Sequence, residues 1–197
     1  MQRNITFWVS AGLSQALFII LSPVWLKLLS YLHPVVLVVV WVCVTALVSF
    51  VVFCVRKDVI NISSNIIKIA ISLYSVGLLV LLFVRPSNQE YNQINLVPFK
   101  TIANFIGGDG GFFVAFYNIS ANVLLFVPFG ITVILLCKNK PSEFLMIVVP
   151  VVVIIIIEGV QHLTRRGSMD VDDLILNILG VGIGYLLSSI VKKVVKV

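Results

Sequence analysis

The stretch FLMIVVPVVVIIIIEGVQHL, residues 144–163, decides the fold. Glu158 is its one charged residue, and seven consecutive Val and Ile residues, 151–157, precede that carboxylate. About 20 apolar residues in an α-helix, at a rise of about 1.5 Å each, cross the hydrocarbon core of a bilayer. The stretch therefore predicts a membrane-spanning helix, in which Pro150 is tolerated as prolines often are in such helices.

The composition of the whole chain extends this prediction. Of its 197 residues, 60% are hydrophobic and 11% are charged, whereas a soluble domain carries roughly 25% charged residues. These proportions exclude a soluble globular domain, a disordered tail, a disulfide scaffold and an ordinary cytosolic enzyme. Transmembrane barrels need short segments of alternating polarity, and this chain has long unbroken apolar runs. We therefore expect an all-α, polytopic integral membrane helical bundle.

Six apolar stretches predict about six transmembrane helices. The first resembles a signal peptide because Arg3 precedes it, but it continues past Ser22-Pro23 without a small-residue cleavage site, so we expect a retained helix. The three cysteines, Cys43, Cys54 and Cys137, form no CxxC pair and are interpreted as packing residues or reduced thiols. The predicted spans are 5–29, 34–55, 66–84, 119–137, 144–163 and 173–191.

The basic residues at the ends of these spans predict their orientation. The positive-inside rule places the richer set of ends in the cytoplasm, so both termini are expected to be cytoplasmic. No cysteine falls in a loop that this topology places outside. The richer set holds Arg3, Arg56, Lys57, Lys68, Lys138, Lys140, Lys192, Lys193 and Lys196, and the other holds Lys27, Arg85, Lys100, Arg165 and Arg166.

Two polar loops, 85–118 and 164–172, then face outward. Within the longer loop, apolar residues at helical spacing predict a short helix lying in the membrane interface. The glycine-rich segment 107–111 stops this helix and reads either as a flexible turn or as a phosphate-binding nest, although no P-loop Lys-Ser/Thr follows it. The apolar residues of the interfacial helix are Phe99, Ile102, Phe105 and Ile106.

Polar residues inside the predicted spans are candidates for function, because a carboxylate near the centre of a membrane helix costs about 2.5–3.5 kcal/mol to insert. Glu158 shares a helix face with Gln161 and His162, at i+3 and i+4. Asp173 shares a face with Asn177, Gly180 and Gly184, the last two forming a GxxxG that permits close helix packing. Both faces lie at the outer end of the predicted bundle. Arg165 and Arg166 lie in the adjoining loop, where they either pair with the acids or extend their charged groups to the membrane interface.

The span 119–137 adds Asn122, which lies inside the apolar run, and Pro128, which bends the helix. Purely structural interpretations of these residues stay open. In them, Asn122 forms a hydrogen bond between helices, and Asp170, Asp172 and Asp173 cap a helix and complement its dipole. The functional hypothesis is one polar cavity open to the outer leaflet. Its predicted members are Asn95, Pro98, Phe99, Asn122, Pro128, Glu158, Gln161, Arg166, Asp170, Asp172, Asp173, Asn177 and Gly180.

Three blocks within Asn95–Tyr185 resemble the VanZ-like family of bacterial membrane proteins. The first is Asn95-Leu-Val-Pro98-Phe99, and the second is Asn122-Val-Leu-Leu-Phe126-Val-Pro128-Phe-Gly130. The third runs from Glu158 and Gln161 through Arg166 and Asp170 to Gly180. We therefore expect a VanZ-like core domain at 85–191. N-terminal transmembrane helices at 1–84 precede it, and the resemblance implies nothing about the first two of these spans. A basic cytoplasmic tail is expected at 192–197.

The resemblance also implies a multi-pass protein of a bacterial cell membrane, associated with resistance to glycopeptide antibiotics, notably lipid-tailed teicoplanin. We expect a protein without a cofactor or nucleic acid partner, whose partners are the bilayer and a lipid-tailed glycopeptide or cell-wall lipid precursor.

Two alternative functions remain. One is an enzyme of the cell envelope with Glu158, Asp172 and Asp173 as acid and base, assisted by His162, or holding a divalent metal. The other is a small transporter. The oligomeric state is not predicted.

Overall fold

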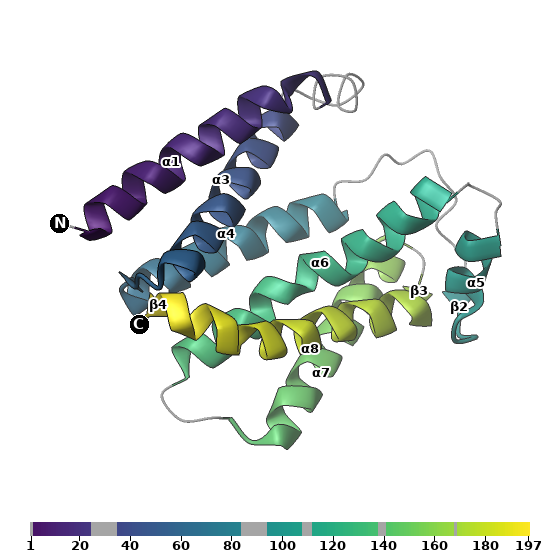
Figure 1. Ribbon diagram of the computed structural model, residues 1–197. Helices are drawn as coiled ribbons and strands as arrows, with labels where there is room; N and C mark the ends of the chain where they lie inside the picture. Colours follow the sequence, from purple (N-terminus) through teal and green to yellow (C-terminus); the bar gives the residue numbers. More distant parts are fainter. Residues whose placement is uncertain (1, 25–34, 84–93, 108–111, 138–140, 168) are drawn as a thin grey trace. The chain divides into compact units, whose positions relative to one another are not determined.

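The computed structural model describes residues 2–24, 35–83, 94–107, 112–137, 141–167 and 169–197, and these residues are mainly helical (Figure 1). This confirms the predicted all-α class. Within the described ranges, four two-residue strands accompany the helices. The helices are α1 (Gln2–Ile20), α3 (Val35–Arg56), α4 (Ser64–Phe83), α5 (Lys100–Gly107), α6 (Phe112–Leu136), α7 (Glu143–Leu163) and α8 (Val171–Val194).

The contacts divide the chain into two compact units. One comprises residues 1–61 together with Lys192–Lys196, and the other comprises Ile62–Val191. The helix α4 thus belongs to the second unit, while the division predicted from the sequence lies at residue 84.

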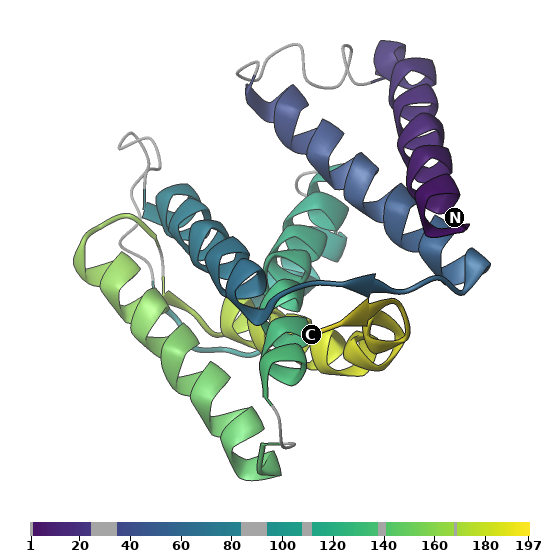
Figure 2. The same ribbon diagram turned by 90° about the vertical axis from the view of Figure 1, so that its left-hand side faces the viewer.

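The first unit is built on a hairpin of α1 and α3, which lie side by side in both views (Figures 1 and 2). Small polar side chains at i, i+4 and i+8 of α1, Thr6, Ser10 and Ser14, are buried. Such residues let membrane helices approach closely. Farther along α1, Gln15 Oε1 accepts a hydrogen bond of 2.7 Å from the indole nitrogen of Trp41 on α3.

The C-terminal residues complete this unit. The strand β4 (Val195–Lys196) pairs in parallel with β1 (Ile60–Asn61), with Ile60 opposite Val195 and Asn61 opposite Lys196. The hydroxyl of Thr6 donates a hydrogen bond to the carboxylate of Asp58, next to this pair. The end of the chain is therefore tied to the segment that follows α3.

In the second unit, α6 and α8 pack backbone against backbone. A Cβ added at Gly180 would collide with the carbonyl oxygen of Val123. A Cβ added at Gly184 would lie 2.9 Å from the Cα of Gly130 on α6. The prediction that the GxxxG of residues 180–184 serves helix packing is confirmed.

The core of this unit lies where α4, α6, α7 and α8 meet. Its buried side chains come from all four helices and are Leu78, Leu82, Phe126, Ile154 and Val181. Two tyrosines bridge these helices through backbone carbonyls: Tyr74 Oη donates to Leu125 O and Tyr185 Oη donates to Met146 O, each at 2.9 Å.

Among the described residues, three helices are long and apolar enough to cross a membrane: Asn118–Leu136, Glu143–Leu163 and Val171–Val194. Shorter apolar helical stretches lie in α1, α3 and α4. The structure therefore agrees with an all-α membrane protein, while the number of six spans stays a prediction.

Two helices have ends that differ from the ends of the predicted spans. The helix α1 ends at Ile20, because the nearby Pro23 has no N–H to continue a helix, and 25–29 of the predicted span lie outside the described residues. The helix α6 starts at Phe112, so the preceding connection is shorter than expected, but the part of α6 that is long and apolar enough to cross a membrane, Asn118–Leu136, agrees with the predicted span 119–137.

The short helix predicted after residue 99 is present as α5, and it starts at Lys100, so Phe99 precedes it. The glycine-rich segment that was expected to stop this helix falls mainly on 108–111, outside the described residues. The side chains of Phe105 and Ile106 are outside them as well. Cys54 and Cys137 are free thiols, as expected.

Candidate functional site

Two aspartates at the start of α8 hold α5 in place. Asp172 is fully buried, and its carboxylate accepts hydrogen bonds from the backbone N–H groups of Phe99 at 2.5 Å, Thr101 at 2.7 Å and Ile102 at 3.1 Å. The N–H groups of Thr101 and Ile102 belong to the first turn of α5, where a helix leaves its donors without partners inside itself, and Phe99 directly precedes the helix. Asp172 thus caps a helix far away in the sequence.

This capping depends on the backbone of Phe99. Its φ of 64° lies in the left-handed region, which is uncommon for a bulky residue and turns its N–H toward Asp172. The Phe99 side chain is exposed. Phe99 therefore enters the site through its backbone, and the preceding Pro98 is an exposed turn residue.

Asp170 connects the same segment by side-chain bonds. The strand β2 (Ile94–Asn95) pairs in parallel with β3 (Met169–Asp170), which sets Asn95 opposite Asp170. Asn95 Nδ2 donates to Asp170 Oδ1 at 3.1 Å, and Thr101 Oγ1 donates to Asp170 Oδ2 at 2.6 Å. Asp170 also accepts the N–H of Asp172 at 2.9 Å, which caps α8 itself. We call Asn95, Thr101, Asp170 and Asp172 the α5 clamp.

A second polar group forms where α6, α7 and α8 face one another. Asn122, Glu158, Gln161, Asp173 and Asn177 line one small cavity, together with Gly167 and the apolar side chains of Leu82, Leu125 and Phe126. Five residues predicted for a shared cavity thus do converge. We call these five polar residues the polar cluster. It shares no residue with the α5 clamp, but Glu158 and Asp170 both line a second small cavity of about 60 Å³.

Three members of the polar cluster, Asn122, Gln161 and Asp173, form hydrogen bonds between helices. Asn122 Nδ2 on α6 donates to Asp173 Oδ1 on α8 at 2.5 Å. Gln161 Nε2 on α7 donates to the carbonyl oxygen of Leu82 on α4 at 3.1 Å. Glu158 is 7% exposed and Asn177 is 5% exposed. Within the described part of the chain, Asn177 Oδ1 meets no hydrogen-bond donor.

The volume of this cavity limits its chemistry. It measures about 20 Å³, and a single water molecule needs roughly 10–15 Å³ measured in the same way. The cavity matches a water-sized group and is far smaller than a lipid head group or a sugar. Two carboxylates and the Asn177 oxygen are acceptors, so a group held there would donate hydrogen bonds or carry positive charge.

Four other predicted residues do not line this cavity. His162 is on α7 but does not line the cavity, and its Nδ1 is buried without a hydrogen-bond partner among the described residues. Arg166 follows α7, and its N–H donates to the carbonyl of Gln161 at 2.8 Å. Pro128 lies inside α6, and Gly180 contacts α6 through its backbone. Within the residues that the structure describes, no three His, Cys, Asp or Glu side chains are grouped to hold a metal.

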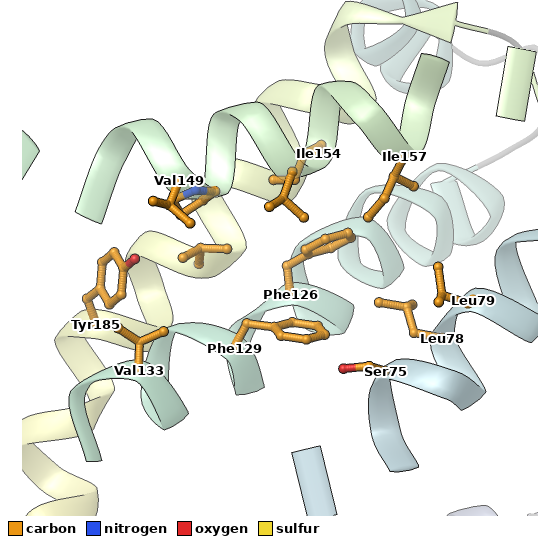
Figure 3. A pocket seen from close by; sticks show the side chains of 13 residues that line it. Ser75, Leu78, Leu79, Phe126, Phe129, Val133, Val149, Ile154, Ile157 and Tyr185 are labelled. Carbon is orange, nitrogen blue, oxygen red and sulfur yellow. The ribbon is translucent and has the colours of Figure 1, made fainter. Parts of the chain in front are cut away.

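Sequence reasoning missed an apolar cavity beside the polar cluster. It measures about 390 Å³ and lies between α4, α6, α7 and α8. Figure 3 shows Phe126 and Phe129 along its middle, Tyr185 toward one end and Leu78 and Leu79 toward the other. Phe126 also lines the polar cavity, so the two cavities share one wall. No sequence signal separates the residues that line this cavity from residues that pack or face lipid, since nearly all of them are apolar.

Residues 71–192, more than half of the chain, match the VanZ/LLP1 family. The chain belongs to the VanZ/LLP1 family. This confirms the resemblance drawn from the three sequence blocks. No curated protein and no solved structure matches the chain. The part that matches VanZ/LLP1 contains the α5 clamp, the polar cluster and the apolar cavity, whereas α1 and α3 precede it.

Proposed function

We propose that this VanZ/LLP1 protein is a multi-pass protein of a bacterial cell membrane that lowers susceptibility to lipid-tailed glycopeptides such as teicoplanin. In this proposal it binds the hydrocarbon tail of the drug, or of a cell-wall lipid precursor, in the outer leaflet. Both termini are then cytoplasmic, and the α5 clamp and polar cluster lie toward the outer surface. The basic residues at the ends of the spans support this topology.

The observation that carries the proposal is the apolar cavity and its shared wall with the polar cluster. A volume of about 390 Å³ falls within the range of roughly 300–1,000 Å³ typical of small-molecule sites. Its lining is almost wholly hydrocarbon, which suits an acyl or prenyl chain. The polar cavity is too small for the head of such a ligand, so the head would remain in the interface, near the exposed residues Leu96, Val97 and Phe99.

The test compares two Ser→Phe variants in a susceptible Gram-positive host at matched membrane levels. Ser75 lines the apolar cavity, and its hydroxyl donates a hydrogen bond of 2.7 Å to the carbonyl of Ile71 in its own helix. Ser189 is exposed, and its hydroxyl bonds in the same way to Leu186 at 2.8 Å. Ser75→Phe fills the cavity, and Ser189→Phe adds the same ring outside it.

Growth inhibition by a tailed and a tail-less glycopeptide is the readout. We expect the wild type and Ser189→Phe to protect against the tailed drug alone, and Ser75→Phe to lose this protection. Equal protection by the two variants would exclude the apolar cavity as the tail site. Protection against both drugs, or against neither, would contradict the proposed function itself.

The enzyme alternative has one supporting observation, because Glu158 and Asp173 line the same cavity. A pair of carboxylates in one desolvated site is a common source of a general acid and base. Turnover of a labelled undecaprenyl or phospholipid substrate by the purified protein, lost in Glu158→Gln, would establish this activity in place of passive binding. The absence of turnover across a panel of such lipids would speak against it.

A further inference from the structure

The first unit of the chain carries a concentration of positive charge that the proposed function does not use. Five exposed basic residues lie at the ends of α3 and α8 and in the following segments. Asp58 is the only acidic residue in the sequence of this unit, and its carboxylate accepts a hydrogen bond from Thr6. The five are Arg56, Lys57, Lys192, Lys193 and Lys196.

The parallel pairing of β1 with β4 brings together charges from two segments that are far apart in the sequence. Asn61 lies opposite Lys196, so the residues that follow α3 run beside the residues that follow α8. Without this pairing, the lysines of the C-terminal segment would have no fixed relation to Arg56 and Lys57. The basic cluster is therefore a product of the fold and not of one local sequence run.

Lys57 occupies a backbone position that favours glycine. Its φ is 56°, and the N–H of Asp58 donates to the carbonyl of Phe53 at 3.1 Å, which closes the end of α3. The left-handed residue that ends such a helix is usually glycine, because a side chain there is strained. A lysine at this position gives up some stability while adding a charge to the cluster.

A cavity of about 630 Å³ lies in the same unit. It is lined by the polar side chains of Asn4, Ser10, Ser49 and Asn61 and by the rings of Phe7 and Phe53. Its lining thus combines hydrogen-bonding groups with apolar surface. Asn61 joins the cavity to the basic cluster, because it lines the former and pairs with Lys196 of the latter.

We propose that this unit binds an anionic phospholipid, whose phosphate lies among the five basic residues and whose glycerol and upper acyl carbons enter the Asn- and Ser-lined cavity. Clusters of four to eight basic residues beside a membrane helix attract anionic lipids, each at roughly 1 kcal/mol. The polar side chains suit the ester and hydroxyl groups of the head, and Phe7 and Phe53 suit the chains. Most of this site lies outside residues 71–192, the part that matches the family.

The test measures binding of phosphatidylglycerol to the purified full-length chain in detergent, by native mass spectrometry and by the shift in thermal midpoint. Phosphatidylcholine with the same acyl chains and inorganic phosphate are the comparison probes. We expect phosphatidylglycerol to bind and stabilise the protein more than either. Equal effects of the two lipids, or of phosphate alone, would overturn the proposal.

Variants separate binding from folding. Lys57→Gln/Lys196→Gln removes two charges and is expected to weaken phosphatidylglycerol binding about thirtyfold, while Lys100→Gln/Arg165→Gln removes two exposed charges elsewhere and should leave it unchanged. Lys57→Gly removes one charge and also relieves the backbone strain at this position. Without lipid this variant should have a higher thermal midpoint than the wild type, and it should still bind phosphatidylglycerol more weakly. Unchanged binding in both Lys57 variants would overturn the proposal. Since the readout is lipid binding and not drug protection, it fails or succeeds independently of the proposed function.

Discussion

Replacing Asp172 by Asn tests whether this acid holds α5 or serves chemistry. In the wild type, one carboxylate oxygen accepts from Phe99 N and the other from Thr101 N and Ile102 N. An Asn has one acceptor oxygen, and its NH₂ would face the N–H groups on the other side. The substitution keeps the size of the side chain and removes both its charge and part of its accepting capacity.

The magnitude follows from the bonds that are lost. Hydrogen bonds to a charged group contribute about 1.5–3 kcal/mol each, and at least two of the three are lost or weakened when Asn replaces Asp172. We therefore expect the free energy of unfolding to fall by about 3 kcal/mol, at the low end of that range for two bonds. For a chain of this size, this lowers the thermal midpoint by about 6–12 °C.

Thermal unfolding in detergent and amide hydrogen exchange are the measurements. Exchange should speed up first at Phe99, Thr101 and Ile102, whose N–H groups lose their acceptor. Glu143→Gln is the control, because Glu143 is an exposed acid in the first turn of α7 and its loss should cost less than about 0.5 kcal/mol. An Asp172→Asn protein with wild-type stability and wild-type exchange in α5 would refute the capping role and reopen a chemical one.

Three further predictions concern packing and backbone. Gly130→Val should destabilise the protein by about 3 kcal/mol or more in thermal unfolding, because the new side chain collides with the carbonyl of Val181 on α8. Overpacking of this kind costs roughly 1–3 kcal/mol even where the backbone can shift. Tyr185→Phe should lower the free energy of unfolding by about 1 kcal/mol in the same assay, since it removes the hydrogen bond to Met146 O. Wild-type stability in this variant would mean that the bond does not form in the membrane. Phe99→Gly should raise the free energy of unfolding by roughly 0.5–1 kcal/mol, because glycine adopts the observed φ without strain. A loss of stability would show that the exposed ring contributes packing.

The polar faces of α7 and α8 were predictable from the sequence. Helical spacing alone puts Glu158 beside Gln161, and Asp173 beside Asn177, and these four do line one cavity with Asn122. Close helix packing at Gly180 and Gly184 also followed from their spacing, although the spacing did not identify α6 as the partner helix. These predictions work because membrane helices are regular, so that a residue's face depends on its number alone.

The separation of the acids into two groups was not predictable. Asp170, Asp172 and Asp173 are near neighbours in sequence, and a single shared cavity was the simplest expectation. The strand pairing of Asn95 with Asp170 turns two of the acids toward α5, while Asp173 faces Asn122. A two-residue parallel pairing carries no periodic pattern, and the left-handed φ of Phe99 runs against the preference of its residue type.

This separation changes how substitutions at the acids should be interpreted. Variants of Asp170 or Asp172 would lose drug protection because α5 is no longer held by hydrogen bonds, even if neither carboxylate contacted a ligand. Glu158 and Asp173 line a cavity and do not contact the α5 backbone in the bonds described above, so their isosteric variants Glu158→Gln and Asp173→Asn are the informative ones. A loss of drug protection in these two, with α5 still protected from hydrogen exchange, would place the function at the polar cluster. The same loss accompanied by exposed α5 amides would instead show that the two groups act as one structural unit.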